Sequence, residues 1–571
     1  MTASWIIDQL VQQGVHHFCI APGSRSTPLV MAAATHKKAK IHVHYDERGL
    51  GFYALGLAKG SAKPAALIIT SGTALGNVLP SVMEAHHTCT PMILLTADRP
   101  AELKDCSANQ TTDQVKLFQP FIRWQVDLPC ELNEAYFRSI MAQAYFYACQ
   151  NPPGPVHINC PFRDPLYDPN AIIEEGKPFE IQFPKHKVEL KRSCHSKGLI
   201  LIGRLPNQSD VHSILKLAER LQWPVCADIL SNARCFSTPE QIRNFDWIEK
   251  PEPELVLHFG ERMTSKKILE WLKRIKTELI HISPWPFLQD PARILTGRVQ
   301  ADIVEFCQAF DAPSDPSWLK SWEDSEPVFE EGDIPLSARN DIFDKASAQG
   351  LQQRSCAETG HVKNMADAGG CKDGDAGEIK NVISGRERYY FTEVHAMRQI
   401  SQILPEEFGV FLGNGMPIRD ADHFLFPKTC KGFFGNRGLS GIDGNIATLA
   451  GLAEEMPILG IIGDQATLYD LNSLPLLKKT KHPVILLISN NFGGGIFHHL
   501  PVSESPHFET LWAAAHDIRF EHAAKLFDIP YFQFDAIHKA LQSGKSGVVE
   551  LITNRIANYK YQKSLCLPVQ R

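Results

Sequence analysis

Short runs of apolar, β-branched residues recur along the chain, and they alternate with longer stretches in which apolar residues return every three or four positions. The short runs are typical of buried strands in parallel sheets, and the longer stretches are typical of amphipathic helices. Turns that contain glycine or serine separate the two patterns. This alternation predicts an α/β protein whose parallel sheets are covered by helices. Because one hydrophobic core does not grow to 571 residues, we expect roughly three domains.

Three blocks carry this pattern, and each is predicted to form a doubly wound parallel-sheet domain. The first block covers residues 1–180, with strands at 17–20, 41–44, 65–70, 92–96 and 156–159. The second covers residues 190–312, with strands at 199–203, 225–228, 255–260 and 279–283. The third covers residues 389–571, with strands at 410–412, 458–463, 484–489 and 548–552. Clear helical patterns occupy residues 51–59, 132–149 and 391–404.

Residues 313–388 separate the second block from the third and show little periodicity. They contain prolines, many acidic residues and a stretch rich in glycine, aspartate and lysine at 366–379. A segment of this composition cannot bury enough apolar surface to fold by itself. We therefore predict a long linker with a disordered excursion.

Composition narrows the class of protein. Apolar residues make up 44% and charged residues 21% of the chain, as in an ordinary soluble protein. The net charge of -6 gives no electrostatic reason to expect nucleic acid or an anionic membrane as a partner. The N-terminus lacks the features of a signal peptide, and the longest apolar runs are too short to span a bilayer. Fourteen cysteines without a C-x-x-C pair indicate reduced thiols, so we expect a cytoplasmic enzyme.

Two polar motifs follow predicted strands of the third block. Gly463-Asp464-Gln465 comes after the run 458–462, and Asn490-Asn491 comes after the run 484–489. Strand ends of this kind meet at the carboxyl edge of a parallel sheet, where such sheets bind ligands. A carboxylate, an amide oxygen and a backbone carbonyl suit Mg²⁺, and the glycines after Asn491 let the backbone approach a diphosphate. Each motif alone is more often a plain turn. Together they resemble the metal and diphosphate signature of thiamine-diphosphate enzymes.

Thiamine chemistry also needs a carboxylate against the aminopyrimidine ring, to favour the tautomer that removes the thiazolium proton. Glu47 follows the second predicted strand, where thiamine-diphosphate enzymes place this glutamate. The alternative for Glu47 is an exposed ion pair within the Asp-Glu-Arg cluster. The strand-to-helix turn Ser71-Gly72-Thr73 resembles a cofactor-binding turn of the same enzymes.

Arginines, lysines and polar residues also stand near predicted strand ends. An arginine at such a place is usually a structural ion pair. A converging set would instead suit carboxylate substrates, because guanidinium groups bind carboxylates through paired hydrogen bonds. The set comprises Ser24, Arg25, Arg99, Gln110, Lys266, Lys267, Arg419 and Arg437.

Taken together, the motifs resemble the family of 2-succinyl-5-enolpyruvyl-6-hydroxy-3-cyclohexene-1-carboxylate (SEPHCHC) synthases of menaquinone biosynthesis. The first block matches with C-I-A-P-G-S-R-S-T-P-L at 19–29, D-E-R-G-L-G at 46–51, L-L-T-A-D-R-P at 94–100 and H-I-N-C-P-F at 157–162. The third block matches with N-R-G-x-S-G-I-D-G at 436–444 and G-D-x-x-x-L-Y-D-L-N at 463–472.

The resemblance implies a transferase that decarboxylates 2-oxoglutarate on thiamine diphosphate and adds the succinyl carbanion equivalent to isochorismate. The first block would be the pyrimidine-binding domain and the third the diphosphate-binding domain. Asp464, Asn491 and the Gly493 carbonyl would hold Mg²⁺, with Mn²⁺ as an alternative. The family places the glutamate and the metal across a subunit interface, which implies at least a homodimer.

The resemblance also assigns the rest of the pocket. The set of cationic and polar residues would bind substrate, and Ile442 would be the apolar wedge that bends the cofactor. Ile496, Phe497 and Leu500 would form an apolar wall, although such residues are often plain core. The chain departs from the family pattern at Gln465 in place of glycine, at Gly415 in place of a small hydroxyl residue, and at Lys267 in place of arginine. Residues 336–386 lengthen the linker.

Two other functions stay open from the sequence. One is a different thiamine-diphosphate decarboxylase or carboligase, of the pyruvate decarboxylase or acetolactate synthase type. The other is a non-catalytic relative that binds the cofactor. The several pocket cations argue against the first, and the presence of Glu47, Asp464 and Asn491 argues against the second.

Overall fold

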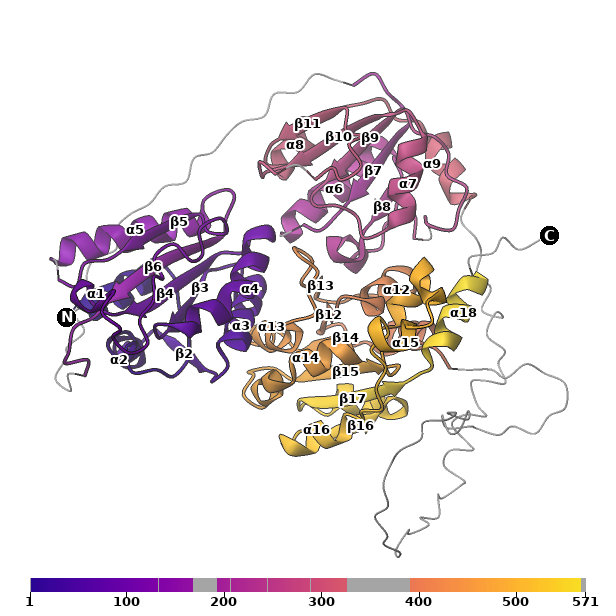
Figure 1. Ribbon diagram of the computed structural model, residues 1–571. Coiled ribbons are helices and arrows are strands. Elements are labelled where there is room, and N and C mark those ends of the chain that lie inside the picture. Colours follow the sequence, from indigo (N-terminus) through magenta and orange to yellow (C-terminus); the bar gives the residue numbers. More distant parts are fainter. Residues whose placement is uncertain are drawn as a thin grey trace, which may run out of the picture. The chain divides into compact units, whose positions relative to one another are not determined.

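The computed structural model describes residues 2–131, 133–167, 193–205, 207–243, 245–287, 289–325 and 391–565. Most of the predicted linker, including 336–386 and the stretch 366–379, lies outside these residues. The described residues form three separate sheets, and every strand pairing within them is parallel (Figure 1). The predicted fold class, three doubly wound parallel sheets, is confirmed.

The first sheet has six strands in the order β2-β1-β3-β4-β6-β5. Its strands are β1 (His17–Ile20), β2 (Lys40–Val43), β3 (Ala65–Ile69), β4 (Met92–Asp98), β5 (Trp124–Asp127) and β6 (Pro155–Pro161). Its helices are α1 (Thr2–Gln12), α2 (Thr27–Thr35), α3 (Glu47–Ser61), α4 (Thr73–His87) and α5 (Glu134–Cys149). One buried cluster joins the sheet to α1, α2 and α5, and another joins it to α3 and α4. Helices therefore cover both faces.

The central sheet has five strands in the order β11-β10-β9-β7-β8. These are β7 (Gly198–Ile202), β8 (Val225–Ala227), β9 (Leu255–Phe259), β10 (Glu278–Ser283) and β11 (Gly297–Gln300). Helices α6 (Gln208–Leu221), α7 (Lys266–Arg274) and α8 (Ile303–Ala309) pack on it. A further helix, α9 (Pro316–Glu323), lies where we expected linker. It buries Trp318 and Trp322 in the central core, so this core extends beyond residue 312.

The third sheet repeats the topology of the first, with the order β13-β12-β14-β15-β17-β16. Its strands are β12 (Gly409–Leu412), β13 (Gly432–Phe434), β14 (Ile458–Gly463), β15 (Val484–Asn490), β16 (Tyr531–Gln533) and β17 (Gly547–Ile552). Its helices are α11 (Glu393–Ile403), α12 (Met416–Phe424), α13 (Asn445–Leu452), α14 (Asp464–Tyr469), α15 (Phe508–Leu511), α16 (Glu521–Leu526), α17 (Ile537–Gln542) and α18 (Arg555–Leu565). Within the described part of the chain, no helix has both the length and the apolar character needed to cross a membrane.

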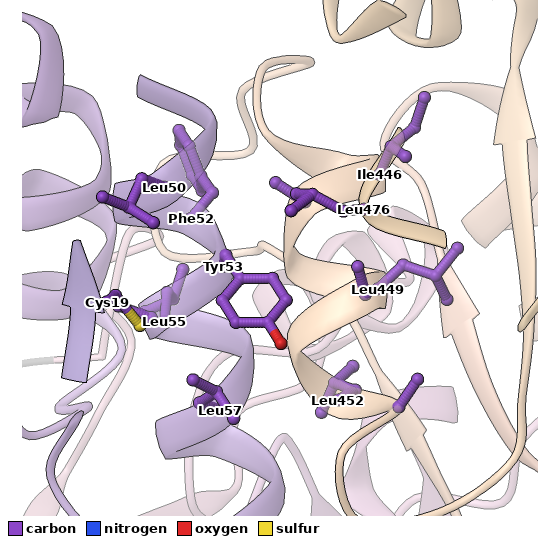
Figure 2. Close-up of a cluster of buried hydrophobic side chains, with 14 of the residues drawn as sticks. Cys19, Leu50, Phe52, Tyr53, Leu55, Leu57, Ile446, Leu449, Leu452 and Leu476 are labelled. Atoms are coloured by element: carbon purple, nitrogen blue, oxygen red, sulfur yellow. The ribbon is translucent and has the colours of Figure 1, made fainter. Parts of the chain in front are cut away.

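Helices α3 and α13 join the first and third sheets. Asp46 starts α3 by accepting hydrogen bonds from the backbone N–H groups of Arg48 and Gly49, as an N-cap residue does. Figure 2 shows side chains of the two helices meeting in one buried cluster, with Tyr53 between them. The Tyr53 hydroxyl donates to Glu454 Oε1 at 3.1 Å at the rim of this cluster.

Glycines bring the two helix backbones together. A Cβ atom on Gly56 would lie 2.1 Å from the backbone oxygen of Thr448, and one on Gly451 would lie 2.2 Å from the backbone oxygen of Tyr53. The atoms in the way belong to backbone and cannot rotate aside. The closeness of this helix pair therefore depends on the missing side chains.

We expect Gly56→Ala to destabilise the protein, because the added methyl forces α3 and α13 apart. Overpacking of this kind costs about 1–3 kcal/mol. Gly76→Ala on α4 is the matched control, since a Cβ there meets nothing within 4 Å. In that open helical position alanine is favoured over glycine by roughly 0.5–1 kcal/mol. Thermal unfolding should therefore shift down for Gly56→Ala and slightly up for Gly76→Ala, and equal shifts would contradict the close-packing argument.

Candidate active site

The predicted residues of the first block gather at one edge of its sheet. Arg25 lies beyond the end of β1, Glu47 beyond β2, Ser71 beyond β3 and Arg99 directly after β4. Because the strands are parallel, these ends share the carboxyl edge where α/β sheets bind ligands. The expectation that these residues stand at strand ends is met for all four.

Hydrogen bonds connect several residues at this edge of the sheet. Arg99 donates from a guanidinium nitrogen to the Ser71 hydroxyl, and Ser71 Oγ donates to the Gln110 backbone oxygen at 3.0 Å. Gln110 Nε2 returns a hydrogen bond to the Ser71 backbone oxygen at 2.8 Å. Arg25 is buried and donates to the Phe162 backbone oxygen at 2.9 Å. The pKa of Arg99 is lowered, first by burial and then by the charge of Arg25, so an anion here would relieve two nearby positive charges.

Glu47 is the first residue of α3 and is half-buried. Its Oε2 accepts a hydrogen bond from Asn77 Nδ2 at 3.1 Å. Within the part of the chain that the structure describes, the ion pair of the Asp-Glu-Arg cluster joins Arg48 to Asp46 and does not include Glu47. The turn at Gly72 has φ +82°, and a Cβ there would meet the Gln110 side chain at 2.9 Å. Ser24 and Thr73, predicted for the same pocket, are exposed.

The metal motif lies at the equivalent edge of the third sheet. Asp464 follows β14 and Asn491 follows β15, and these two strands are neighbours. The buried Asp464 carboxylate accepts from the backbone N–H groups of Gly493 at 2.9 Å and Gln465 at 2.7 Å. Burial raises the pKa of Asp464, and these hydrogen bonds oppose that rise. The three residues predicted as ligands are therefore brought together.

A buried glutamate orients Asn491. Glu393 Oε1 accepts from Asn491 Nδ2 at 2.8 Å, from Ser489 Oγ at 3.0 Å and from Thr553 Oγ1 at 3.1 Å. The amide nitrogen of Asn491 is thereby fixed toward α11. Its Oδ1 atom is buried and accepts no hydrogen bond from any residue in the described ranges. Asn491 Oδ1 is thus an acceptor oxygen that is left available to a ligand.

The two arginines predicted in the third block each donate a hydrogen bond to a nearby residue. Arg419, on α12, donates to the Gly415 backbone oxygen, and Arg437 donates to Asn414 Oδ1 at 3.0 Å. Burial, and then the charge of Arg419, lowers the pKa of Arg437. Gly415, one of the departures from the family pattern, has φ +100°, a conformation that glycine adopts without strain.

The apolar residues predicted for the pocket are only partly covered. Ile442 is 42% exposed and Leu500 is 42% exposed, while Ile496 and Phe497, on a short 3-10 helix at Gly495–His499, are half-buried. None of the four belongs to a buried core cluster of the described residues. The plain-core alternative for the apolar wall is therefore not supported.

The two lysines of the central sheet are exposed at the start of α7. Ser265 caps this helix and donates to Asp246 Oδ1 at 2.6 Å, while Asp246 Oδ2 lies 3.0 Å from His423 Nε2 on α12. Lys267 Nζ lies 3.8 Å from the centre of the Trp247 ring, a cation–π contact. The helix that begins with Lys266 is thus connected to the helix that carries Arg419.

Comparison with known proteins shows which proteins this chain is similar to. Residues 1–117 match the model for the N-terminal TPP binding domain of thiamine pyrophosphate enzymes, and residues 174–331 match the model for their middle domain. A relative from Salinibacter ruber is 33% identical over 99% of this chain and 96% of its own length. Relatives from Rubrobacter xylanophilus and Aliivibrio fischeri are each 32% identical, over 98% and 96% of this chain and 96% and 92% of their own lengths. All three are named SEPHCHC synthase.

The chain belongs to the SEPHCHC synthase family. It is a thiamine-diphosphate-dependent enzyme, as the sequence resemblance predicted. The sequence predicted a Mg²⁺ site at the edge of the third sheet, and the residues there can be tested against that prediction. Among the described residues, no group of three histidine, cysteine, aspartate or glutamate side chains could hold a metal ion. One carboxylate, one free amide oxygen and a backbone carbonyl remain, and these oxygen donors fit Mg²⁺.

Several residues of this synthase site escaped prediction. Glu393 opens a helix, where glutamates are common for other reasons. Asp246 and His516 stand in irregular segments, yet His516 Nε2 lies 3.3 Å from Asp464 Oδ2. Gln465, seen only as a departure, donates to the Ala513 backbone oxygen at 2.7 Å and so anchors the loop beside the metal motif. No periodicity or spacing marks these four residues.

Proposed function

We propose that this chain decarboxylates 2-oxoglutarate and transfers the resulting four-carbon unit to isochorismate, forming SEPHCHC and CO2. The observation that carries the proposal is the joint presence of a buried arginine edge, a glutamate at the start of α3 and an oxygen donor set for a metal. Both substrates are dicarboxylates, which gives the arginines a chemical purpose. A cytoplasmic location belongs to the same proposal.

The residues would divide the work between the sheets. When bound, thiamine diphosphate supplies the electron sink that allows a 2-oxo acid to lose CO2. Glu47 would hold a proton against the aminopyrimidine ring, while Ser71, Gly72 and Thr73 would line that side of the cofactor. Asp464, Asn491 and the Gly493 carbonyl would hold the metal. Ile442, Ile496 and Phe497 would bound the cofactor on its apolar side.

The substrate carboxylates would be bound by side chains from all three sheets. Charge-assisted hydrogen bonds from guanidinium groups fix both the position and the orientation of a carboxylate. Arg25 and Arg99 already donate hydrogen bonds to Phe162 and Ser71. These two side chains therefore lose little conformational freedom when a substrate binds. The substrate-binding residues in this proposal are Ser24, Arg25, Arg99, Gln110, Lys266, Lys267, Arg419, Arg437 and Leu500.

The domain division also remains part of the proposal. Residues 1–180 would bind the pyrimidine, residues 389–571 would bind the diphosphate and metal, and residues 190–312 would form the scaffold between them. The three sheets lie inside these ranges, which supports the division.

CO2 release from 2-oxoglutarate tests the reaction. Purified protein with thiamine diphosphate and Mg²⁺ should release CO2 faster when isochorismate is added, and a new adduct should appear at the mass of SEPHCHC. Turnover of pyruvate in preference to 2-oxoglutarate would keep the cofactor but assign another thiamine-diphosphate reaction. No CO2 from either acid would overturn the proposal.

Arg99→Ala should impair substrate binding more than cofactor binding. Losing hydrogen bonds from a charged donor raises the KM for 2-oxoglutarate by about 10- to 100-fold. The Kd for thiamine diphosphate should stay near its original value. Arg163→Ala is the matched control, because Arg163 follows β6 at the same edge but pairs with Glu102 in the solvent. A variant that changed only cofactor affinity would contradict the assignment of Arg99 to substrate.

We also propose that two copies of the chain complete each active site. In the described residues no hydrogen bond or ion pair links Glu47 or Arg99 with Asp464 or Asn491, which supports a site shared between subunits. Mixing Glu47→Gln protein with Asp464→Asn protein would then restore one intact site per mixed dimer. After full exchange, recovery should reach about one quarter of wild-type activity. Stable mixed dimers without any recovery would place both residues in a site within one chain.

A further inference from the structure

Two cysteines from different sheets approach each other closely. Cys235 ends the short 3-10 helix at Ala233–Cys235, after β8 of the central sheet, and Cys430 precedes β13 of the third sheet. Their sulfur atoms are 3.2 Å apart, although 195 positions separate them in the chain. Neither residue belongs to the thiamine-diphosphate site described above.

Hydrogen bonds beside the pair connect the two segments that carry the cysteines. The backbone N–H of Phe433 donates to Asn232 Oδ1 at 2.7 Å, three residues from each cysteine. Arg234, next to Cys235, donates to Asp422 Oδ1 at 2.9 Å. Asp422 Oδ1 also accepts from the backbone N–H of Ile229 at 3.1 Å. The seam between the two sheets is therefore already assembled on both sides of the sulfur atoms.

We propose that Cys235 and Cys430 form a redox-active dithiol site that closes reversibly to a disulfide and staples the central sheet to the third sheet. A disulfide has an S–S distance of about 2.05 Å, so the sulfurs need to approach by only about 1 Å. The two sulfur atoms already lie close enough that the bond needs only this small approach.

The two thiols have different chemical roles. The pKa of the Cys430 thiol is lowered, chiefly by a hydrogen bond with Cys235 and also by the Gly432 backbone. The same contact with Cys430, followed by burial, raises the pKa of Cys235. Cys430 is half-buried and Cys235 is buried, so an external reagent meets Cys430 first. Because the thiolate is the nucleophile, Cys430 is assigned as the attacking residue and Cys235 as the resolving one.

The oxidant is a low-molecular-weight disulfide, RSSR. The Cys430 thiolate attacks one sulfur of RSSR, which gives a mixed disulfide and releases RS⁻. Cys235 then loses its proton and attacks the Cys430 sulfur, releasing the second RS⁻. The balance is two protein thiols and RSSR giving one protein disulfide and two RSH, so the protein loses two electrons and RSSR gains them.

A cavity gives such a reagent access to the pair. It has a volume of about 820 Å³ and is lined by Cys235 and by residues 428 and 429, directly before Cys430. Its other charged lining residues are Lys216, Lys320, Lys428, Glu219, Glu240 and Glu323. Side chains of both signs suit a disulfide whose own groups are carboxylates and amines. The cavity contains none of the residues assigned to substrate, cofactor or metal.

Peptide mapping of the full-length holoenzyme tests the proposal. Protein is incubated with glutathione disulfide, free thiols are blocked with an alkylating reagent, and a non-reducing digest is analysed by mass spectrometry. We expect a Cys235–Cys430 linked peptide from most molecules, and its disappearance after treatment with dithiothreitol. Cys106 and Cys194, which are exposed, report whether the reagent has reacted. The proposal is wrong if these two thiols react while Cys235 and Cys430 are recovered alkylated or as separate mixed disulfides.

Thermal unfolding provides a second measurement. Because the link would close a loop of 195 positions, it restricts the unfolded chain, and the oxidised protein should unfold several degrees higher than the reduced protein. Cys430→Ser and Cys235→Ser should each abolish the difference. Cys307→Ser, which changes a buried thiol of α8 in the same central sheet, should retain it. An equal rise in the Cys430→Ser and wild-type proteins would show that another reaction causes it.

Discussion

Glu47→Gln protein should bind thiamine diphosphate and yet lose most of its turnover. The glutamine has the size of glutamate and can keep the contact with Asn77, so the start of α3 should be unchanged. It cannot hold a proton against the aminopyrimidine ring as a carboxylate does. Loss of one positioned acid–base group lowers the rate by about 100- to 10 000-fold. Turnover of 2-oxoglutarate and calorimetric titration of the cofactor measure the two effects separately.

Exchange of the C2 proton of bound thiamine diphosphate for deuterium gives a readout that does not depend on substrate. It should slow with turnover in the Glu47→Gln protein. Glu134→Gln is the matched control, because the partly exposed Glu134 also lies at the start of a helix of the same sheet and pairs with a neighbouring arginine, Arg138. Turnover near the wild-type value in Glu47→Gln would remove Glu47 from its proposed role.

The interior of each sheet was predictable from the sequence, and the edges were largely not. Interior strands such as β3 and β9 are buried at every position, which makes an apolar run stand out. Four strands escaped prediction, namely β5, β11, β13 and β16. All four are short edge strands in the observed orders, and all but β13 are half-buried or exposed along their length. An edge strand packs on fewer neighbours, so its sequence carries less of the apolar signal.

The residues of the candidate site were also only partly predictable from the sequence. Arg99 and Asp464, directly after a strand, and Glu47, a few residues after one, were predictable because the fold brings strand ends to one edge. Residues that orient another side chain of the site were not predictable from the sequence. Glu393 reaches Asn491 across 98 positions of sequence, and Asp246 reaches His423 across 177. Such contacts depend on how sheets and helices pack, and local sequence does not encode that packing.

Contacts between the first and third sheets fix the position of one proposed substrate-binding residue. The Glu84 carboxylate, on α4, accepts from the backbone N–H groups of Gly438 at 2.9 Å and Leu439 at 2.8 Å. Lys59, on α3, donates to Asn436 Oδ1 at 2.8 Å. The first sheet thus positions the loop that carries Arg437. Arg437, a substrate-binding residue in our proposal, therefore lies in a loop that helices of the first sheet hold in place.

Asp464→Asn protein should lose metal-dependent binding of thiamine diphosphate. The substitution keeps the shape of the side chain but removes the only carboxylate in the proposed donor set of Asp464, Asn491 and the Gly493 carbonyl. Changes to residues that merely support metal ligands cost 10- to 100-fold in affinity, so loss of a charged ligand should weaken binding by at least about 100-fold. Calorimetric titration of thiamine diphosphate with Mg²⁺, and again with a chelator, measures the metal-dependent part directly.

Another carboxylate of the same domain provides the control for this prediction. Asp528→Asn removes a carboxylate of the same domain that pairs with Lys478 in the solvent, and it should leave cofactor binding unchanged. Gly493 donates to Oδ2 of Asp464 and Gln465 donates to Oδ1, so the single amide oxygen of asparagine can keep one of these two hydrogen bonds. The hydrogen bond from Gln465 Nε2 to the Ala513 backbone oxygen is untouched, so the loop should remain folded. If Mg²⁺ still strengthened cofactor binding in this variant as it does in the wild type, the metal would have to be held elsewhere. Asn491 Oδ1 would then remain a buried acceptor without a purpose, which makes Asn491→Ala the decisive second variant.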